Sequence, residues 1–206
     1  MLKIWGRTNS INVQKVMWTV GELELPHEHT SVGGAFGGLD TDEYGAMNPN
    51  RRVPVITDGD VTVWESNAIV RYLCAKHSTG ALWATDPGER SVADRWMDWQ
   101  AASVAPDLIT VFLGLIRTPE ADRNMTLIDA AVGRLNAQMG ILDTQLRKTG
   151  WVAGETLSMG DIPTGALAYR WLNLPIDRPD LSAVVDYHAR LAERPAFRDH
   201  VMIPLS

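Results

Sequence analysis

The hydrophobic pattern changes near residue 80, and this change most limits what the chain can fold into. Before that point, strand-like runs occur at residues 2–5, 27–32, 53–57 and 61–64. From about residue 87, the strand pattern fades and only helical periodicity remains. We therefore predict an α/β domain over residues 1–79 and an all-α domain over residues 87–206.

Helical stripes are expected in both parts of the chain. In the first part, the apolar residues at helical spacing are Val13, Val16, Met17, Val20 and Leu23, and another helix is expected from Ser66. In the second part, the two stripes are Val92, Trp96, Trp99, Ser103 and then Leu135, Met139, Leu142, Leu146. A final helix is expected over residues 182–193, ending before Pro195.

Local signals predict where several elements turn or begin. Asp58-Gly59 is a two-residue hairpin signal, because glycine tolerates positive φ. Ser158 and Asp161 have capping-box spacing, with Asp in place of Glu, although Pro163 would remove one backbone donor just inside that helix.

Composition excludes several classes of protein. The 19 basic and 25 acidic residues give a net charge of −6, and neither part of the chain is basic, which argues against binding to nucleic acid or anionic membranes. The single cysteine, Cys74, excludes an internal disulfide and a Cys-x-x-Cys pair, and its helical setting predicts a packed side chain. We see no signal peptide and no membrane-spanning stretch, and we expect a cytoplasmic protein.

The pair Val53-Pro54 is the first candidate for ligand binding. Proline at the start of an internal strand is unfavourable, because it offers no donor to the neighbouring strand. A cis bond would relieve this and leave the Val53 amide and carbonyl available to a peptide-like ligand. An ordinary edge-strand proline is the alternative, since only about 5–6% of X-Pro bonds are cis.

Glu65-Ser66 lies at a predicted strand-to-helix junction. Free amides at a helix N-terminus suit a carboxylate, and Glu65 could pair with an ammonium group, so the junction could hold the head group of an α-amino acid. The alternative is a simple N-cap at Ser66 beside a solvated Glu65.

The polar loop at residues 8–12 precedes the first predicted helix. A thiolate placed there would be stabilised by the helix dipole and by a donated hydrogen bond. Helix capping is the alternative. His27 and His29 point the same way on a predicted strand, but a solvated strand edge is favoured over a metal site there.

Together these pieces resemble the cytosolic glutathione transferases, as a serine-type, theta- or beta-like bacterial member. The most specific stretch is Asn48-Pro49-Asn50-Arg51-Arg52-Val53-Pro54, then Asp58-Gly59, then Trp64-Glu65-Ser66-Asn67-Ala68. Ser158-Met159-Gly160-Asp161 and Arg194-Pro195-Ala196-Phe197 resemble the family's later helix signals. The resemblance covers essentially the whole chain. It implies a thioredoxin-like β-α-β-α-β-β-α domain followed by an all-helical domain.

The resemblance also implies a role for each matching residue of the glutathione site. Pro54 would be a cis-proline, and the Val53 backbone would pair with the cysteinyl part of glutathione. Glu65 and Ser66 would bind the γ-glutamyl ammonium and carboxylate, while Arg52, with Arg51 as a possible second contributor, would help to hold the ligand.

The residue that activates the thiol is less clearly indicated by the resemblance. Ser10 falls where serine-type members place their activating hydroxyl, but Asn12 stands where those members often have Pro. Asn12, or Asn9, is therefore an alternative donor to the thiol.

The implied activity is conjugation of the glutathione thiolate to an electrophilic small molecule, as in detoxification. Glutathione would be a co-substrate, no metal is expected, and the family is usually homodimeric. Trp5, Trp96 and Trp99 lie where the resemblance places the second-substrate pocket, although each could instead be a core residue. A glutathione-dependent peroxidase or dehalogenase, and a non-catalytic glutathione-binding protein, are the alternatives.

Overall fold

The computed structural model describes residues 1–206 and divides the chain into two compact units. One unit comprises Met1–Trp83 and Pro195–Ile203, and the other comprises Ala84–Arg194 and Pro204–Ser206. The C-terminal residues Pro195–Ile203 thus group with the first unit, while the sequence analysis placed them in the all-helical domain predicted over residues 87–206.

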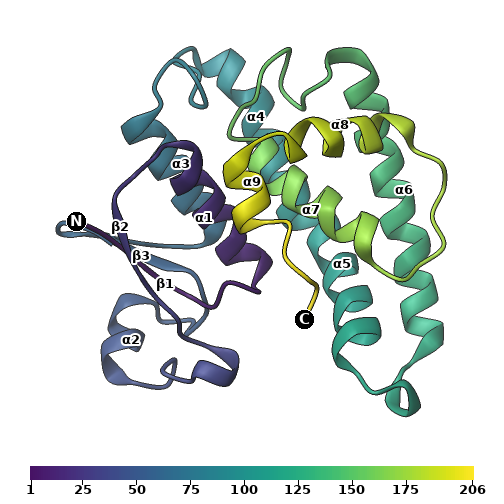
Figure 1. Cartoon of the computed structure of the whole chain (residues 1–206), viewed down its shortest axis with the longest axis horizontal. Coiled ribbons are helices and arrows are strands. Elements are labelled where there is room, and N and C mark those ends of the chain that lie inside the picture. The colour runs from purple at the N-terminus through teal and green to yellow at the C-terminus, as the bar shows by residue number, and fades with distance from the viewer. The chain divides into compact units, whose positions relative to one another are not determined.

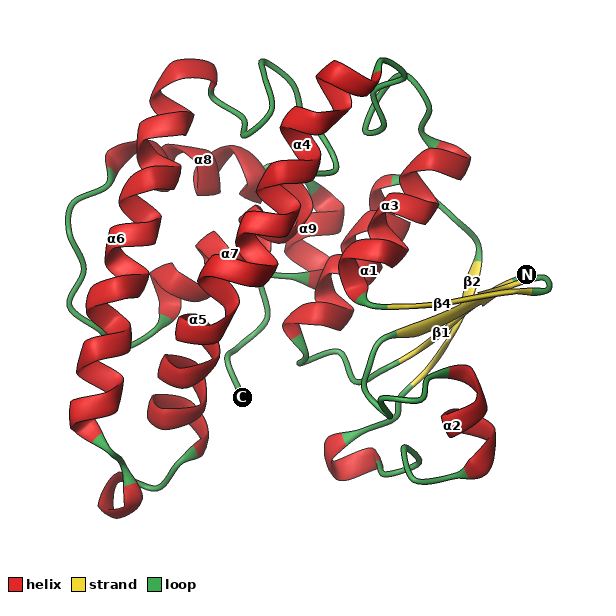
Figure 2. Cartoon of the chain, turned by 180° about the vertical axis from the view of Figure 1, so that it is seen from behind, coloured by secondary structure: helices red, strands yellow, loops and turns green.

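The first unit has the expected thioredoxin-like order of elements. These are β1 (Leu2–Trp5), α1 (Ile11–Glu22), β2 (His27–Thr30), α2 (Asp42–Met47), β3 (Val55–Asp58), β4 (Val61–Trp64), α3 (Ser66–His77) and α9 (Pro195–His200). The sheet order is β2-β1-β3-β4, with β1 parallel to β2 and the other pairs antiparallel. Helices α1 and α3 cover one face of the sheet, and α2 lies on the other side (Figures 1 and 2).

Apolar side chains from β1, β3, α1 and α3 form the core of this unit. Its fully buried members include Ile4, Val13, Val16, Ile56, Ile69 and Leu73. Helix α9 adds Phe197, whose ring packs edge-on against Trp18 of α1 with centroids 4.8 Å apart. This helix was missing from the sequence prediction, because Pro195 was taken only as the end of the previous helix. Proline is equally suited to begin a helix, as it does here.

The β3–β4 hairpin turns one residue later than predicted. Asp58 pairs with Val61, so the two-residue loop is Gly59-Asp60. Gly59 has φ of 62°, and glycine at the first loop position with positive φ fits a type II′ turn.

The second unit is all-helical, as predicted. It contains α4 (Pro87–Trp99), α5 (Ala105–Phe112), α6 (Met125–Thr149), α7 (Asp161–Asn173) and α8 (Ser182–Ala192), with π-helical turns at Gln100–Val104 and Leu113–Arg117. The predicted stripe of α6 is buried at Leu135, Met139, Leu142 and Leu146. In contrast, Ser103 is exposed, because the π-helical turn changes the phase of the other predicted stripe.

Polar groups at the start of α7 are buried and fully bonded. The Asp161 carboxylate accepts hydrogen bonds from the Ser158 amide and hydroxyl, both at 2.8 Å, and from the Val152 amide at 3.0 Å. This forms the reach-back half of the predicted capping box. Pro163 is the third residue of α7, where the backbone N–H has no partner within the helix, so it breaks no hydrogen bond.

One helical stretch has the length and composition to cross a membrane, contrary to the sequence expectation. It is Pro87–Arg117, with a mean hydropathy of 1.4 in its most apolar window, of which 28% is buried. A single helix of this kind is weak support for a membrane span. Within the second unit this stretch packs on α6, where Arg134 forms an ion pair with Asp107 at 2.7 Å.

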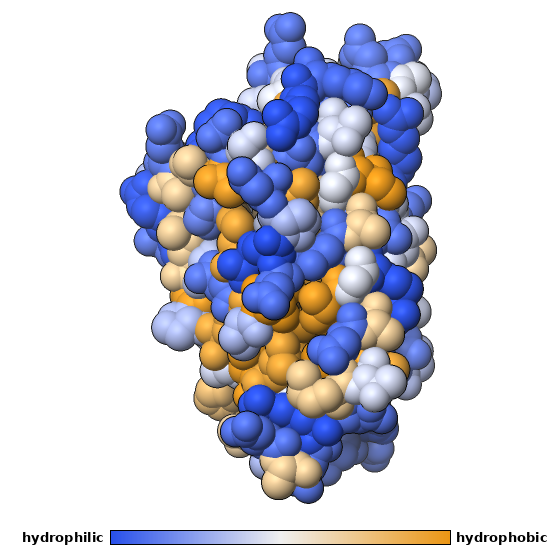
Figure 3. Space-filling view, turned by 90° about the vertical axis from the view of Figure 1, so that its right-hand side faces the viewer, coloured by the Kyte–Doolittle hydropathy of each residue, from blue (hydrophilic) through white to orange (hydrophobic).

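Hydrophobic side chains also gather around a hollow on one face of the molecule (Figure 3). The second unit contains an open cavity of about 470 Å³ lined by Leu115, Met125, Ile128, Asp129, Val132, Leu174, Pro175, Ile176, Asp177 and Arg178. None of the predicted site residues lines this cavity.

Candidate glutathione site

Three predicted site segments leave the sheet at the same end. Trp5 of β1 is paired with Val55 of β3, and Val55 is paired with Trp64 of β4, so these residues form one row across the sheet. The loop after Trp5, the Val53-Pro54 pair before Val55 and the Glu65-Ser66 pair after Trp64 therefore lie next to this row. The strand register thus brings together residues that are more than 50 positions apart in the sequence.

The N-cap and the first turn of α1 offer two side-chain donors that are not already bonded, on Ser10 and on Asn12, the second residue of the helix. Ser10 is the N-cap of α1, yet its side chain makes no capping hydrogen bond. Asn12 is exposed, and its only bonded atom is Oδ1. Asn9 Oδ1 likewise accepts a hydrogen bond, from Arg7 at 2.9 Å. Ser10 Oγ and Asn12 Nδ2 form no hydrogen bond with the protein.

A buried lysine contacts side chains at the starts of both α1 and α3. Lys15 is only 3% exposed, and its ammonium lies 3.1 Å from Asn12 Oδ1, 3.5 Å from Ser66 Oγ and 3.4 Å from Asn67 Oδ1. Ser66 Oγ in turn donates to Asn12 Oδ1 at 3.2 Å. We did not predict a role for Lys15. The signal was a charged residue between Val13 and Val16, on a helix whose other residues from Val13 to Val20 are apolar or uncharged.

The Val53-Pro54 bond is cis, which resolves the alternatives that the sequence left open. The preceding carbonyl, that of Arg52, accepts hydrogen bonds from Tyr44 Oη at 2.9 Å and Asn48 Nδ2 at 2.8 Å. Tyr44 is buried, which raises its pKa to about 12, so it remains a donor at physiological pH. The Val53 N–H and C=O form no backbone hydrogen bond, and Val53 is only half-buried. These two groups are therefore free to pair with a peptide-like ligand.

The two neighbouring arginines have different surroundings. Arg51 donates to the carbonyls of Leu39 and Thr41 at 2.9 and 2.8 Å, and thus secures the loop before α2. Arg52 is exposed, and its guanidinium makes no such bond. Of the two, Arg52 is the side chain that is available to a ligand.

The helix start at Glu65-Ser66 differs by one residue from the prediction. Glu65 occupies the N-cap position, and Ser66 is the first residue of α3, so Ser66 is not an N-cap. Glu65 has φ of 69°, a left-handed conformation that non-glycine residues seldom adopt and that often marks functional sites. The Glu65 side chain is exposed, whereas Ser66 is 6% exposed. The junction therefore presents a free carboxylate beside the unpaired amides of a helix N-terminus.

The three predicted pocket tryptophans lie in different surroundings. Trp5 is half-buried at the end of β1. Trp96 is 8% exposed and packs edge-on against Trp99, with ring centroids 4.9 Å apart. Trp99 donates through Nε1 to Gln138 of α6 at 3.2 Å. Within the second unit, Trp96 and Trp99 are thus held by packing, while a ligand role for them stays a prediction.

The only protein thiol in the first unit is unsuited to catalysis. Cys74 is fully buried in α3, and burial raises its pKa to about 12. Only the thiolate is a good nucleophile, so Cys74 is inert under ordinary conditions.

Comparisons with known proteins agree on one family. Residues 9–76 match the family described as "Glutathione S-transferase, N-terminal domain". Glutathione S-transferase GstB of Escherichia coli K12 is 40% identical over 211 residues, which cover 100% of both chains. The Escherichia coli disulfide-bond oxidoreductase YfcG is 26% identical over 90% of this chain and 87% of its own length.

A solved structure is similar over the same range. The theta class glutathione S-transferase from Xanthomonas axonopodis pv. citri, with glutathione bound, has a TM-score of 0.96 and 43% sequence identity. The match covers 100% of this chain and 99% of that chain. The protein therefore belongs to the glutathione S-transferase family.

Proposed function

We propose that the protein conjugates glutathione to an electrophilic small molecule by nucleophilic attack of the glutathione thiolate on an electrophilic carbon. The Val53 backbone pairs with the cysteinyl part of glutathione, and Arg52 helps to hold the ligand. Glu65 and Ser66 bind the γ-glutamyl ammonium and carboxylate. Ser10 donates its hydroxyl hydrogen bond to the sulfur.

The observation that carries this proposal is the convergence of unsatisfied groups at one end of the sheet. Val53 has a free N–H and C=O, Glu65 has a free carboxylate, and Ser10 has a hydroxyl that makes no capping bond. A peptide that carries a free amino-acid head group and a thiol has complementary groups for all three. The full-length similarity to glutathione S-transferases supports the same ligand.

The energy required for thiol activation is within reach of these groups. A free thiol has a pKa of about 8.5, and lowering it by two units corresponds to about 2.7 kcal/mol. One hydrogen bond to a charged group contributes about 1.5–3 kcal/mol, and a helix N-terminus adds about 0.3–1 kcal/mol. Ser10 at the N-terminus of α1 combines the two contributions.

A conjugation assay tests this proposal. Purified protein with glutathione and 1-chloro-2,4-dinitrobenzene should form the thioether faster than glutathione alone, followed by absorbance. Replacement of Ser10 by Ala should raise the pKa of enzyme-bound glutathione, read from thiolate absorbance against pH, by about one unit or more. An unchanged pKa would remove Ser10 from the mechanism.

Calorimetry of glutathione binding and turnover assays together distinguish the remaining alternatives. Glutathione binding without turnover across a panel of electrophiles would favour a non-catalytic glutathione-binding protein. Turnover of peroxides or haloalkanes alone would favour a peroxidase or a dehalogenase. Failure to bind glutathione would refute the proposal.

The wider proposal concerns the second substrate and the setting. Trp5, Trp96 and Trp99 are proposed to contact the electrophile, and their aromatic rings suit an apolar or aromatic compound. The proposed assembly is a homodimer in the cytoplasm, and no metal takes part in the proposed reaction. Family membership supports each of these statements.

A further inference from the structure

Lys15 is buried at a position where an apolar side chain would require less free energy to bury. Its side chain is 3% exposed and lies between Val13 and Val16 in the buried part of α1. Moving an ammonium out of water is unfavourable unless its donors are bonded. Three side-chain oxygens meet this need: one on Ser66 of the proposed glutathione site, one on Asn12, the alternative thiol donor predicted from the sequence, and one on Asn67.

These bonds determine which way the Asn12 amide faces. An ammonium only donates hydrogen bonds, so the Asn12 atom that faces Lys15 must be the carbonyl oxygen. Asn12 Oδ1 accepts from Lys15 at 3.1 Å and from Ser66 Oγ at 3.2 Å. Its amide nitrogen is therefore turned away from both, as a free donor on an exposed side chain.

Ligand binding would change one of these two bonds. Where the Ser66 hydroxyl donates to the γ-glutamyl carboxylate in the proposed function, it no longer donates to Asn12. A hydroxyl has a single hydrogen to donate, so Asn12 Oδ1 would keep only the bond from Lys15. Lys15 would thus hold the Asn12 amide in its orientation when glutathione is bound.

We propose that Lys15 is a positioning residue, which keeps the Asn12 amide N–H directed at the glutathione sulfur and thereby lowers the pKa of the bound thiol. This inference rests on the proposed function. It gives the glutathione sulfur a second hydrogen-bond donor, the Asn12 amide, in addition to the Ser10 hydroxyl.

A double-mutant cycle tests the link between Lys15 and Asn12. The variants are Lys15→Met, Asn12→Ala and the double variant, and the readout is the pKa of bound thiol at saturating glutathione, from thiolate absorbance. Each single variant should raise this pKa by about 0.5–1 unit. In the Asn12→Ala background, Lys15→Met should add almost nothing, because its effect passes through Asn12. In Lys15→Arg, the thiol pKa should rise less than in Lys15→Met, because the guanidinium still donates to Asn12.

Several results would overturn the inference. If Lys15→Met raised the thiol pKa equally in both backgrounds, the ammonium would act directly on the sulfur. If it weakened glutathione binding in calorimetry with no change in thiol pKa, Lys15 would be a binding residue. If Lys15→Met fails to fold, an unchanged thiol pKa in Asn12→Ala would refute the inference by itself.

The control variant is Lys3→Met, which removes an exposed lysine of β1 whose side chain is 52% exposed. It should leave both the thiol pKa and the affinity unchanged. Failure of the proposed function would look different. The unmodified protein would then neither bind glutathione nor form the conjugate.

Discussion

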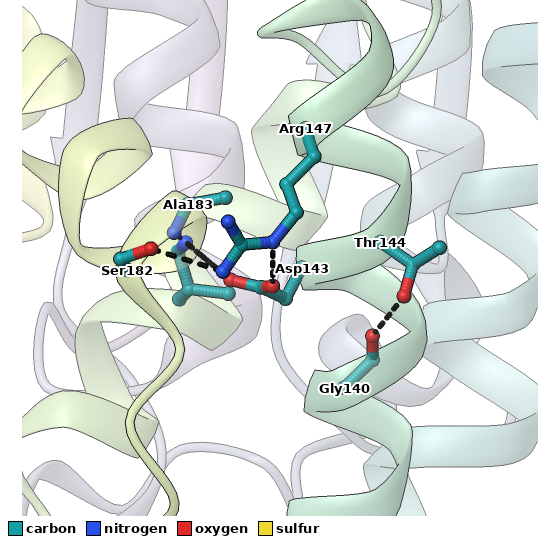
Figure 4. A network of polar contacts seen from close by, with 7 residues as sticks. Gly140, Asp143, Thr144, Arg147, Ser182 and Ala183 are labelled. Carbon is teal, nitrogen blue, oxygen red and sulfur yellow. Dashed lines mark hydrogen bonds and ion pairs between the residues drawn. The ribbon is translucent and has the colours of Figure 1, made fainter.

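Asp143 of α6 caps the N-terminus of α8, although the two helices are joined only through α7. Its Oδ1 accepts hydrogen bonds from the amides of Ala183 at 2.9 Å and Val184 at 3.3 Å, while Oδ2 accepts from Arg147 Nε at 2.7 Å. Figure 4 shows the carboxylate between Arg147 and the first turn of α8. The residue that precedes α8 is Leu181, which has no capping side chain, so Asp143 supplies the cap from another helix.

We predict that Asp143→Ala lowers the free energy of unfolding by about 2–3 kcal/mol. The loss of a helix cap costs about 0.5–2 kcal/mol. The loss lies at the upper end because the cap is charged: a hydrogen bond to a charged group contributes about 1.5–3 kcal/mol, and the Ala183 amide loses that partner, while Val184 N still donates to the Leu181 carbonyl at 3.1 Å. For a chain of this length, the melting temperature should fall by about 4–12 °C.

Urea unfolding and amide hydrogen exchange provide the measurement. The amides of Ala183 and Val184 should exchange faster in Asp143→Ala, while those in the sheet of the first unit keep their protection. The matched control is Arg147→Ala, which removes only the 57% exposed partner and should cost less than about 1 kcal/mol. A cost below about 0.5 kcal/mol for Asp143→Ala, or an equal cost for both variants, would refute the capping argument.

Two further predictions concern polar groups of the first unit. Gln14 is 3% exposed, and its Oε1 has no hydrogen-bond partner. Gln14→Met should therefore raise the free energy of unfolding by about 1 kcal/mol in urea titrations, and a decrease would show that this oxygen is hydrated or bonded. Bonds from Lys76 and Tyr72 lower the pKa of Asp58. Their stabilisation should be complete above about pH 5 and disappear as the pH falls from the ordinary Asp pKa of about 3.9 through the lowered value. Melting curves from pH 7 to 2.5 should show this loss, and Asp58→Asn should make it smaller.

Features that depend on short-range pattern were predictable from the sequence. The α6 stripe from Leu135 to Leu146 is buried, because helical spacing alone determines which residues share a face. The sheet strands were found to within about two residues, because apolar runs bounded by turn signals predict them. For the cis Val53-Pro54 bond, residue pattern left two alternatives open, and only the resemblance to a family favoured one.

Features that depend on distant partners were not predictable. Residue pattern left residues 33–52 as a loop, and only the resemblance implied α2, whose single buried side chain is Tyr44. The N-cap is Glu65 rather than Ser66 because Glu65 has a positive φ, and no glycine at this position indicated that conformation in the sequence. Lys15 acquires its partners only when α3 brings Ser66 and Asn67 beside α1, and Asp143 caps a helix that begins 39 residues later. In each case a long-range contact outweighs a local preference.

Some polar side chains of the first unit are bonded within the protein, and others are free to bind a ligand. The protein's own thiol is buried with a pKa near 12, so any thiol chemistry here requires a sulfur that arrives with a ligand. Polar groups of the predicted site and of the residues that support it fall into two sets. In the first set, the side chains donate hydrogen bonds to other groups of the protein; its members are Arg51, Tyr44, Asn48 and Lys15. Ser10 and Arg52 each keep a donor free, and Glu65 keeps a carboxylate acceptor free. The first set holds the backbone and amide orientations that the second set needs, so a variant in the first set should alter thiol pKa or stability before it alters which ligand is bound.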